Sequence, residues 1–289
     1  MELSNKTAVV TGAGNGIGRA IALALANQGT HIAAVDIEHS NAQATARAAQ
    51  GCGVKAVAYG LDVSQADGME QLAADTWTEF GSVELLFNNA GVMSAPGPTW
   101  ALSAEDAQWV FGVNVFGMLN GIRAFVPRWI AEETQAWLVN TGSEHSLGLP
   151  HGMACGYNAS KHAVMSISDN LRNEVPEHIG VSLFCPGIVE STLWKASERR
   201  PQALGGAKPA NPAGGAAMQF GLSAEEVANK VVEGVREEHY FILTHPHAAT
   251  YAEHRAREIA DAFAKQAPRF EGDEQYDVGN IIKKLQEGA

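Results

Sequence analysis

Thr11-Gly-Ala-Gly-Asn-Gly-Ile-Gly18 is the stretch of sequence that decides the fold. It joins a short apolar run, residues 7–11, to a run rich in alanine and leucine, residues 17–27, and this order predicts a β-strand followed by an α-helix. Glycines at such a junction let the backbone turn sharply, and the N-terminus of a helix favours a negative charge. The stretch therefore predicts an α/β protein that binds a phosphate-containing ligand.

The alternation of strand and helix continues along the chain. Apolar runs predict further strands at residues 31–37, 55–61, 84–88, 136–141, 181–185 and 240–244, and helical patterns lie at 42–50, 66–80, 103–133, 157–175 and 248–265. The long region 103–133 is expected to bend near its glycines, and Ser223-Ala-Glu-Glu226 is a capping box that opens another helix. Apolar strands separated by helices indicate a parallel sheet covered on both faces. Right-handed crossovers then give a doubly wound, Rossmann-type α/β fold, expected as a single domain over residues 1–289.

Two segments fall outside this alternation. Residues 191–222 are rich in glycine, proline and alanine, and we interpret them as a lid over the substrate. Residues 245–289 form a C-terminal extension, whose last part, from Phe270, is expected on the surface or across a neighbouring chain.

Composition excludes several classes of partner. A formal net charge of −12 argues against nucleic acid and against an anionic membrane surface. The three cysteines have no paired spacing, which is typical of thiols in a reducing cytoplasm. The first predicted strand begins too early to leave room for a signal peptide. No apolar stretch is expected to approach the roughly 20 residues that span a bilayer, so a cytoplasmic protein is expected. The two histidines of His245-Pro-His247 lack a third ligand, so no metal site is predicted.

The cofactor follows from the glycine loop and one carboxylate. Gly12, Gly16 and Gly18 give a GxxxGxG spacing. Asp36 closes the second strand about 20 residues downstream, where a carboxylate accepts both hydroxyls of a ribose and repels a 2′-phosphate. Ile37 follows, where an NADP site would often offer arginine. NAD is therefore predicted, with NADP as the less favoured cofactor.

Further motifs make the chain resemble the short-chain dehydrogenase/reductase family over residues 1–190. They are Asp62-Val63, Asn88-Asn-Ala-Gly91 and Pro186-Gly-Ile-Val-Glu-Ser-Thr192. The family usually has threonine where Ser191 stands, and Thr192 is the alternative contact. The resemblance implies that the cofactor is bound by Gly12, Asn15, Gly16, Ile17, Gly18, Asp36, Asp62, Val63, Asn89, Ala90, Gly91, Tyr157, Lys161, Pro186, Gly187, Val189 and Ser191.

The catalytic residues are expected on one helix and one neighbouring loop. Tyr157 and Lys161 are four residues apart and so share a helix face, where an ammonium is expected to lower the pKa of the phenol. Ser143 follows the fifth strand, at the edge of the sheet where ligands bind, and its hydroxyl is suited to holding a substrate oxygen. The resemblance adds Asn114, which would bind a water that links Lys161 to solvent.

The substrate pocket is expected to be roomy and mostly apolar. His145, Met153, Cys155 and Trp194 are the predicted substrate contacts, with Met93, Leu147, Leu149 and His151 near them. Trp194 has the alternative of anchoring the loop that it opens, and Cys155 is interpreted as a pocket filler. Arg199 and Arg200 are candidates to meet an acidic group of the substrate, or are solvated charges.

These residues predict an NAD-dependent oxidoreductase that interconverts a secondary alcohol and a ketone. Residues 112–130 and 240–246 resemble dehydrogenases of benzylic aryl-ether alcohols, and hydroxysteroid and cyclic-alcohol substrates are the alternatives. The glycine spacing argues against sugar epimerases, and the short gap between Tyr157 and Lys161 argues against enoyl reductases. A catalytically silent NAD-binding regulator is the alternative from another class. The resemblance also implies a homodimer or homotetramer built on the helices at 103–133 and 157–175.

Overall fold

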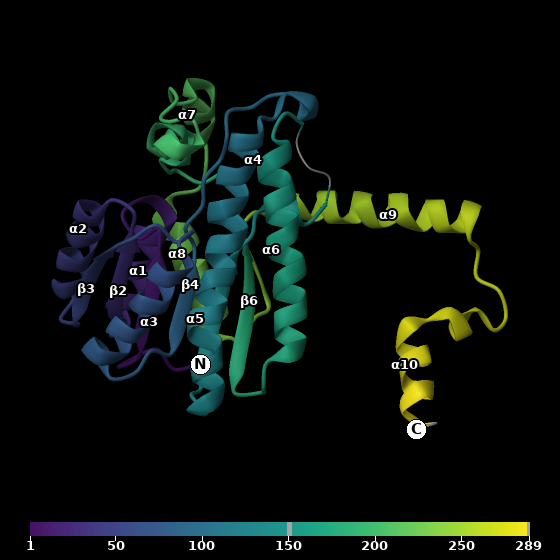
Figure 1. The fold of residues 1–289 in the computed structure, drawn as a ribbon, viewed down its shortest axis with the longest axis horizontal. Coiled ribbons are helices and arrows are strands. Elements are labelled where there is room, and N and C mark those ends of the chain that lie inside the picture. Colours follow the sequence, from purple (N-terminus) through teal and green to yellow (C-terminus); the bar gives the residue numbers. More distant parts are fainter. Residues whose placement is uncertain (149–151, 288–289) are drawn as a thin grey trace.

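A parallel β-sheet forms the centre of the molecule (Figure 1). The computed structural model describes residues 1–148 and 152–287. Within them seven strands pair in the order β3-β2-β1-β4-β5-β6-β7, all in parallel. The strands are β1 Thr7–Thr11, β2 His31–Asp36, β3 Ala56–Gly60, β4 Leu85–Asn88, β5 Ala136–Thr141, β6 Ile179–Cys185 and β7 Phe241–Leu243. The order reverses at β1, so the predicted doubly wound sheet is confirmed and its carboxyl edge has a crevice beside β1 and β4.

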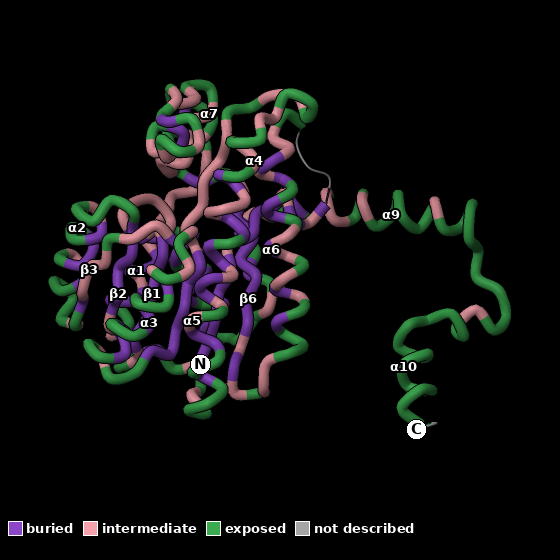
Figure 2. The backbone as a smooth tube through the Cα atoms, viewed as in Figure 1, coloured by how far each residue is buried: buried purple, intermediate pink, exposed green. Residues whose placement is uncertain are grey.

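Helices cover both faces of the sheet. One layer packs α1 (Gly16–Asn27), α2 (His39–Gln50) and α8 (Ala224–Arg236) against the sheet. The other packs α3 (Ala66–Phe80), α5 (Met118–Ala131) and α6 (Cys155–Glu174) against the opposite face. Alternate strand residues enter opposite layers, as Val10 and Val9 do, because successive side chains point to opposite faces. Both faces are therefore buried, which explains the apolar strands (Figure 2).

The long helical region changes its helix type at Gly112–Gly117. It consists of α4 (Ala104–Phe111), a π-helical stretch η2 (Gly112–Gly117) and α5. A Cβ atom on Gly121 would lie 2.3 Å from Oδ1 of Asn88, so a glycine is required where the helix approaches β4.

This region corrects one expectation from the sequence. Residues Ala104–Ala131 form a stretch of 28 residues with a mean hydropathy of 1.3 in its most apolar window, which is long and apolar enough to cross a membrane. The expectation that no apolar stretch approaches that length was therefore wrong. In the structure 56% of that window is buried inside the fold, where it covers the sheet as a core helix.

Residues 191–222 lie above the carboxyl edge of the sheet. They form η4 (Leu193–Arg199), η5 (Gln202–Leu204) and α7 (Pro212–Met218). The buried guanidinium of Arg200 lies 3.0 Å from a carboxylate oxygen of Asp106 on α4, and Nζ of Lys208 lies 3.0 Å from the other oxygen. Arg200 is thus neither a substrate contact nor a solvated charge, because its ion pair with Asp106 connects this segment to α4.

The C-terminal part leaves the sheet. The predicted capping box is present at the start of α8, and after β7 the chain forms η6 (Pro246–Ala248), α9 (Ala249–Gln266), η7 (Asp273–Tyr276) and α10 (Val278–Glu287). α9 and α10 project away from the sheet (Figure 1), and neither helix has a buried residue. The prediction that the chain after Phe270 lies on the surface is confirmed for its described residues (Figure 2).

Candidate active site

A cavity of about 430 Å³ opens at the carboxyl edge of the sheet. The loops after β1, β2, β3, β4, β5 and β6 line it, together with part of residues 191–222. Every residue predicted to bind the cofactor lies on its wall: Gly12, Asn15, Gly16, Ile17, Gly18, Asp36, Asp62, Val63, Asn89, Ala90, Gly91, Tyr157, Lys161, Pro186, Gly187, Val189 and Ser191. Ser191 lines this cavity and its alternative, Thr192, does not.

The glycine loop forms a close-packed cradle. Gly12 has a φ of +66°, and a Cβ atom on Gly18 would lie 2.2 Å from the carbonyl oxygen of Gly12. The hydroxyl of Thr11 accepts hydrogen bonds from the backbone N–H groups of Asn89 (3.0 Å) and Ala90 (3.1 Å), which joins the loops after β1 and β4. Backbone that is free of side chains at a helix N-terminus fits the pyrophosphate of a dinucleotide.

Asp36 lies at the end of β2, with its carboxylate on the cavity wall. One carboxylate oxygen accepts from the backbone N–H of Gly14 at 2.9 Å, and the other accepts from that of Glu38 at 3.0 Å. The side chain is therefore held in place, with Ile37 next to it on the wall. A fixed negative charge at this point suits ribose hydroxyls and repels a phosphate.

Ser143, Tyr157 and Lys161 meet on the opposite side of the cavity. Ser143 follows β5 and caps the short helix η3 (Glu144–Ser146), while Tyr157 and Lys161 lie in the first turns of α6. The Ser143 hydroxyl is near enough to the Tyr157 phenol to lower its pKa. Nζ of Lys161 donates to the carbonyl oxygen of Thr141 at 2.7 Å and lies 5.6 Å from the centroid of the Tyr157 ring.

Burial sets the protonation of this cluster. Desolvation raises the pKa of Tyr157 to about 12, although the nearby Ser143 hydroxyl lowers it, and the charge of Glu144 raises it further. Desolvation also lowers the pKa of Lys161 to about 8. This differs from the expectation that Lys161 brings the pKa of the phenol down. The reason is that both groups are buried, and the ammonium is directed at a backbone carbonyl, so Tyr157 is a protonated phenol at neutral pH.

Asn114 lies behind the cavity wall. It is buried in η2, where its amide nitrogen donates to the carbonyl oxygen of Val92 and to the hydroxyl of Ser160, each at 3.0 Å. Its amide oxygen accepts from the N–H of Val92 at 2.8 Å. A Cβ atom on Gly91 would lie 3.5 Å from that oxygen and 3.7 Å from Nζ of Lys161, so both polar groups converge on Gly91.

Of the four predicted substrate contacts, one lines the cavity and three do not. His145 lines the cavity, and its ring meets the Tyr157 ring edge-on with 5.6 Å between centroids. Met153, Cys155 and Trp194 do not line it. Met153 is 56% exposed, and Trp194 packs on α7, where a Cβ atom on Gly215 would lie 2.8 Å from its ring. Trp194 thus takes the alternative position, as an anchor of its loop.

The rest of the predicted pocket differs in detail. Met93 lines the cavity, Leu147 does not, and Leu149 and His151 lie outside the described residues. Arg199, a predicted candidate for an acidic group of the substrate, lines the cavity. Sequence reasoning missed a group of lining side chains from α4, η2 and residues 191–222: Trp109, Val113, Leu193, Ala217 and Met218. It also missed Glu144, a buried carboxylate between Ser143 and His145 in the chain; its place beside Ser143 was the available signal.

Comparison with known proteins gives the family. The family model described as short chain dehydrogenase matches residues 6–202. A diacetyl reductase [(S)-acetoin forming] of Staphylococcus epidermidis is 35% identical over 192 residues, which are 66% of this chain and 74% of that protein. A 1-deoxy-11-beta-hydroxypentalenate dehydrogenase of Streptomyces arenae is 30% identical over 254 residues, 86% of this chain and 85% of that protein.

A solved structure agrees with both. A short chain dehydrogenase/reductase from Burkholderia phymatum in complex with NAD superimposes with a TM-score of 0.85 at 34% identity, over 93% of this chain and 99% of that one. The chain therefore belongs to the short-chain dehydrogenase/reductase family, as predicted. It is an oxidoreductase of alcohols and ketones, a class that uses a nicotinamide cofactor, and the alternative of a catalytically silent regulator is set aside.

Proposed function

We propose that this enzyme is NAD-dependent and interconverts a secondary alcohol and a ketone of moderate, mostly apolar bulk. One observation carries the proposal: Ser143, Tyr157 and Lys161 border the same cavity as the glycine cradle and Asp36. A proton-transferring group and a hydride-transferring cofactor then share one water-poor space, which the reaction needs.

Each side chain of the cluster has a distinct part in the proposed reaction. In ketone reduction Tyr157 donates its phenol proton to the carbonyl oxygen, and Ser143 holds that oxygen by a hydrogen bond. In alcohol oxidation the Tyr157 phenolate accepts the hydroxyl proton, and Lys161 would hold the ribose of the nicotinamide. When bound, the nicotinamide ring supplies the hydride acceptor or donor for the carbon. We propose that Asn114 keeps the loop after β4 and α6 at a fixed spacing, which aligns Lys161.

Asp36 supports the preference for NAD. Its fixed carboxylate would accept from the adenosine ribose and would repel the 2′-phosphate of NADP. Ile37 adds no positive charge to offset that repulsion.

The cavity wall supports an apolar substrate. Met93, Trp109, Val113, Leu193 and Met218 form an apolar part of the cavity wall. Such a surface suits a ring or a branched carbon skeleton, so benzylic aryl-ether alcohols lead the proposal and hydroxysteroids and cyclic alcohols remain alternatives. Diacetyl and a hydroxypentalenate, the compounds in the names of the two relatives, differ in size from each other. The two relatives therefore leave the choice of substrate open.

Two proposals concern the surroundings of the site. Leu193 and Met218 on the wall support the interpretation of residues 191–222 as a lid. Exposed Phe116 and Ile130 on the long helical region support a homodimer or homotetramer built on it.

Initial rates with NAD⁺ and NADP⁺ over a panel of alcohols test the proposal. The panel holds a benzylic aryl-ether alcohol, a hydroxysteroid, cyclohexanol and acetoin. We expect turnover with NAD⁺, fastest for one of the bulky members. Turnover with NADP⁺ alone, or with none of the alcohols and none of the matching ketones, contradicts the proposal.

A variant of Asp36 tests the basis of the cofactor preference. Asp36→Ser should reduce the ratio of kcat/KM for NAD⁺ over NADP⁺ by about 10- to 100-fold, because two hydrogen bonds are lost to NAD⁺ and one repulsion is removed for NADP⁺. Asp67→Ser, which removes a carboxylate from the start of α3, is the control and should leave the ratio unchanged.

A further inference from the structure

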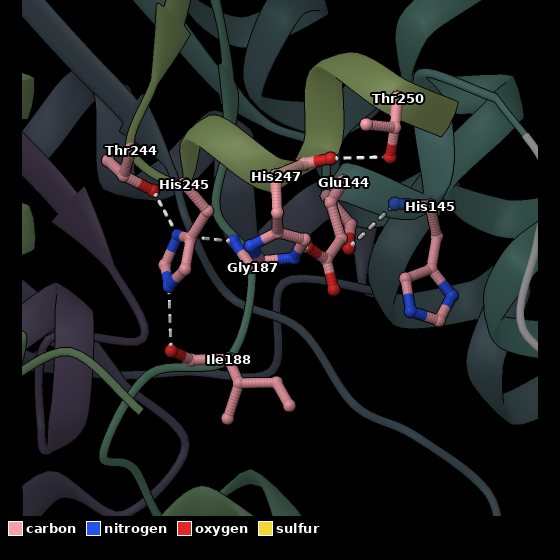
Figure 3. A network of polar contacts seen from close by, with 9 residues as sticks. Glu144, His145, Gly187, Ile188, Thr244, His245, His247 and Thr250 are labelled. Carbon is pink, nitrogen blue, oxygen red and sulfur yellow. Dashed lines mark hydrogen bonds and ion pairs between the residues drawn. The ribbon is translucent and has the colours of Figure 1, made fainter. Parts of the chain in front are cut away.

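A short turn from the C-terminal part of the chain reaches the active site. Residues 244–247, here called the histidine turn, connect β7 to α9 and lie against the loops that follow β5 and β6 (Figure 3). The sequence singled out its two histidines, and neither belongs to the proposed reaction.

His245 binds the backbone of the loop after β6. Its Nδ1 lies 3.0 Å from the backbone nitrogen of Gly187 and its Nε2 lies 2.9 Å from the carbonyl oxygen of Ile188. Because the Gly187 nitrogen is a donor, Nδ1 accepts, and Nε2 must carry the hydrogen that the Ile188 oxygen accepts. The hydroxyl of Thr244 lies 2.8 Å from the same Nδ1. Both ring nitrogens of His245 thus hold the loop after β6 in place.

His247 binds the loop after β5 through Glu144. Its Nε2 lies 2.8 Å from a carboxylate oxygen of Glu144, so the ring donates to the carboxylate. The Glu144 side chain is 5% exposed, whereas that of His247 is 54% exposed. A buried carboxylate is stable only with hydrogen-bond partners or opposite charge, and His247 brings one of these from the surface.

The two contacts meet at one glycine. A Cβ atom on Gly187 would lie 2.7 Å from the Glu144 carboxylate and 2.7 Å from the His245 ring. The backbone N–H of Glu144 also donates to the carbonyl oxygen of Pro186 at 2.8 Å. The loops after β5 and β6 and the histidine turn are therefore packed together without space for one additional carbon atom.

Glu144 connects this packing to the proposed chemistry. It follows Ser143 directly and lines the cavity, and its charge raises the pKa of Tyr157. Groups near this carboxylate include Tyr157 on α6 and both histidines of the turn. The position of the Glu144 carboxylate therefore affects the proton affinity of Tyr157. A metal is not needed to explain the cluster, because both nitrogens of His245 bind backbone atoms.

We propose that Glu144, His245 and His247 are positioning residues of this enzyme: the histidine turn fixes the two loops that carry Ser143 and the Pro186–Val189 backbone. The catalytic roles of Ser143 and Tyr157, on which this proposal rests, are those of the proposed function. It makes residues downstream of the catalytic helix a component of the active site.

Hydrogen exchange and NADH binding test the proposal without any substrate. In His247→Ala the peptides that cover residues 143–148 should exchange about tenfold faster, and in His245→Ala those that cover residues 186–190 should do so, since each loses a hydrogen bond. The dissociation constant for NADH, read by its fluorescence, should rise several-fold in His245→Ala. His247→Gln, which keeps a donor for Glu144, should restore slow exchange. His239→Ala removes an exposed histidine paired with Glu237 at 3.3 Å and is the matched control, expected to change nothing.

A pH profile tests the link to Tyr157. In Glu144→Gln the rise of the alcohol oxidation rate with pH should move about one pH unit lower, because a negative charge beside the phenol is removed. The alcohol is the panel member that the parent enzyme oxidises fastest. An unmoved profile, parental exchange in both histidine variants, or no rescue by His247→Gln overturns the inference. If the parent oxidises no alcohol, the proposed function fails, whereas exchange and NADH binding still decide on the histidine turn.

Discussion

The cavity and the C-terminal arm, residues 249–287, differ in which kind of side chain they bury and which kind they expose. At the cavity wall and directly behind it, buried polar groups have defined partners, as Lys161 has in Thr141 and Asn114 has in Val92. In the arm apolar side chains are exposed, among them Phe263 and Leu285, and neither α9 nor α10 has a buried residue. Burying a polar group costs free energy unless it is hydrogen-bonded, and exposed apolar groups gain nothing in a single chain.

Because of this difference, substitutions in the cavity, in the core and in the arm should have different effects on activity and stability. A small change in the cavity should reduce activity with little effect on folding, a large change in the core should reduce stability alone, and a change in the arm should reduce neither. The four predictions that follow test this separation, from the largest expected effect to the smallest.

Tyr157→Phe should reduce turnover by about 10²- to 10⁴-fold, because it removes the proton-transferring hydroxyl and nothing else. NADH binding and the melting temperature measured beside it should stay close to those of the parent. Parental turnover in this variant would show that another group transfers the proton.

Trp129→Ala should lower the free energy of unfolding by about 3–5 kcal/mol, measured by chemical denaturation. Trp129 is fully buried on α5 and its ring N–H donates to the carbonyl oxygen of Val83 at 2.7 Å. Trp100→Ala is the matched control, because that side chain is 89% exposed, and it should change the free energy by less than about 0.5 kcal/mol. Equal losses in both variants would contradict the assignment of the core.

The two directions of the reaction should respond differently to pH. Burial raises the pKa of Tyr157 to about 12, so the phenol that ketone reduction needs is present throughout pH 7–9. Alcohol oxidation needs the phenolate, whose fraction rises tenfold per pH unit below the pKa. Oxidation should therefore accelerate up to tenfold per unit between pH 7 and 9, while reduction stays nearly constant. An oxidation rate that is flat over this range would place the pKa of Tyr157 below 7.

Leu285→Ala in α10 should change the free energy of unfolding by less than about 0.5 kcal/mol, because the side chain is 69% exposed. Leu25→Ala in α1, where leucine is fully buried, should lose about 2–5 kcal/mol by the same measurement. A loss of that size in Leu285→Ala, especially one that depends on protein concentration, would mean that another chain covers α10.

The fold could be predicted from the sequence because local patterns and global packing agree in it. Strands β1 and β5 and helix α3 were predicted at the bounds that the structure has. The cofactor wall was also predictable, since loops that follow parallel strands meet at one edge of the sheet and each carries a recognisable motif.

What could not be predicted depends on tertiary contacts between distant residues. The pKa of Tyr157 depends on its burial, which outweighs the effect expected from Lys161 four residues on. Arg200 looks like a surface charge in the sequence because its partner, Asp106, lies on another element. Trp194 packs on α7 and not on the cavity, since small residues at Gly214 and Gly215 receive its ring.

The bond between Glu144 and His247 has a consequence for protein engineering. The family model matches residues 6–202, so one end of this bond lies inside the shared region and the other lies beyond it. A chimera that joined residues 1–202 to the tail of a relative would keep the Ser143, Tyr157 and Lys161 side chains but would bury the Glu144 carboxylate without this imidazole. Recombination of the two parts should therefore preserve activity only when the tail supplies a hydrogen-bond donor at the position of His247.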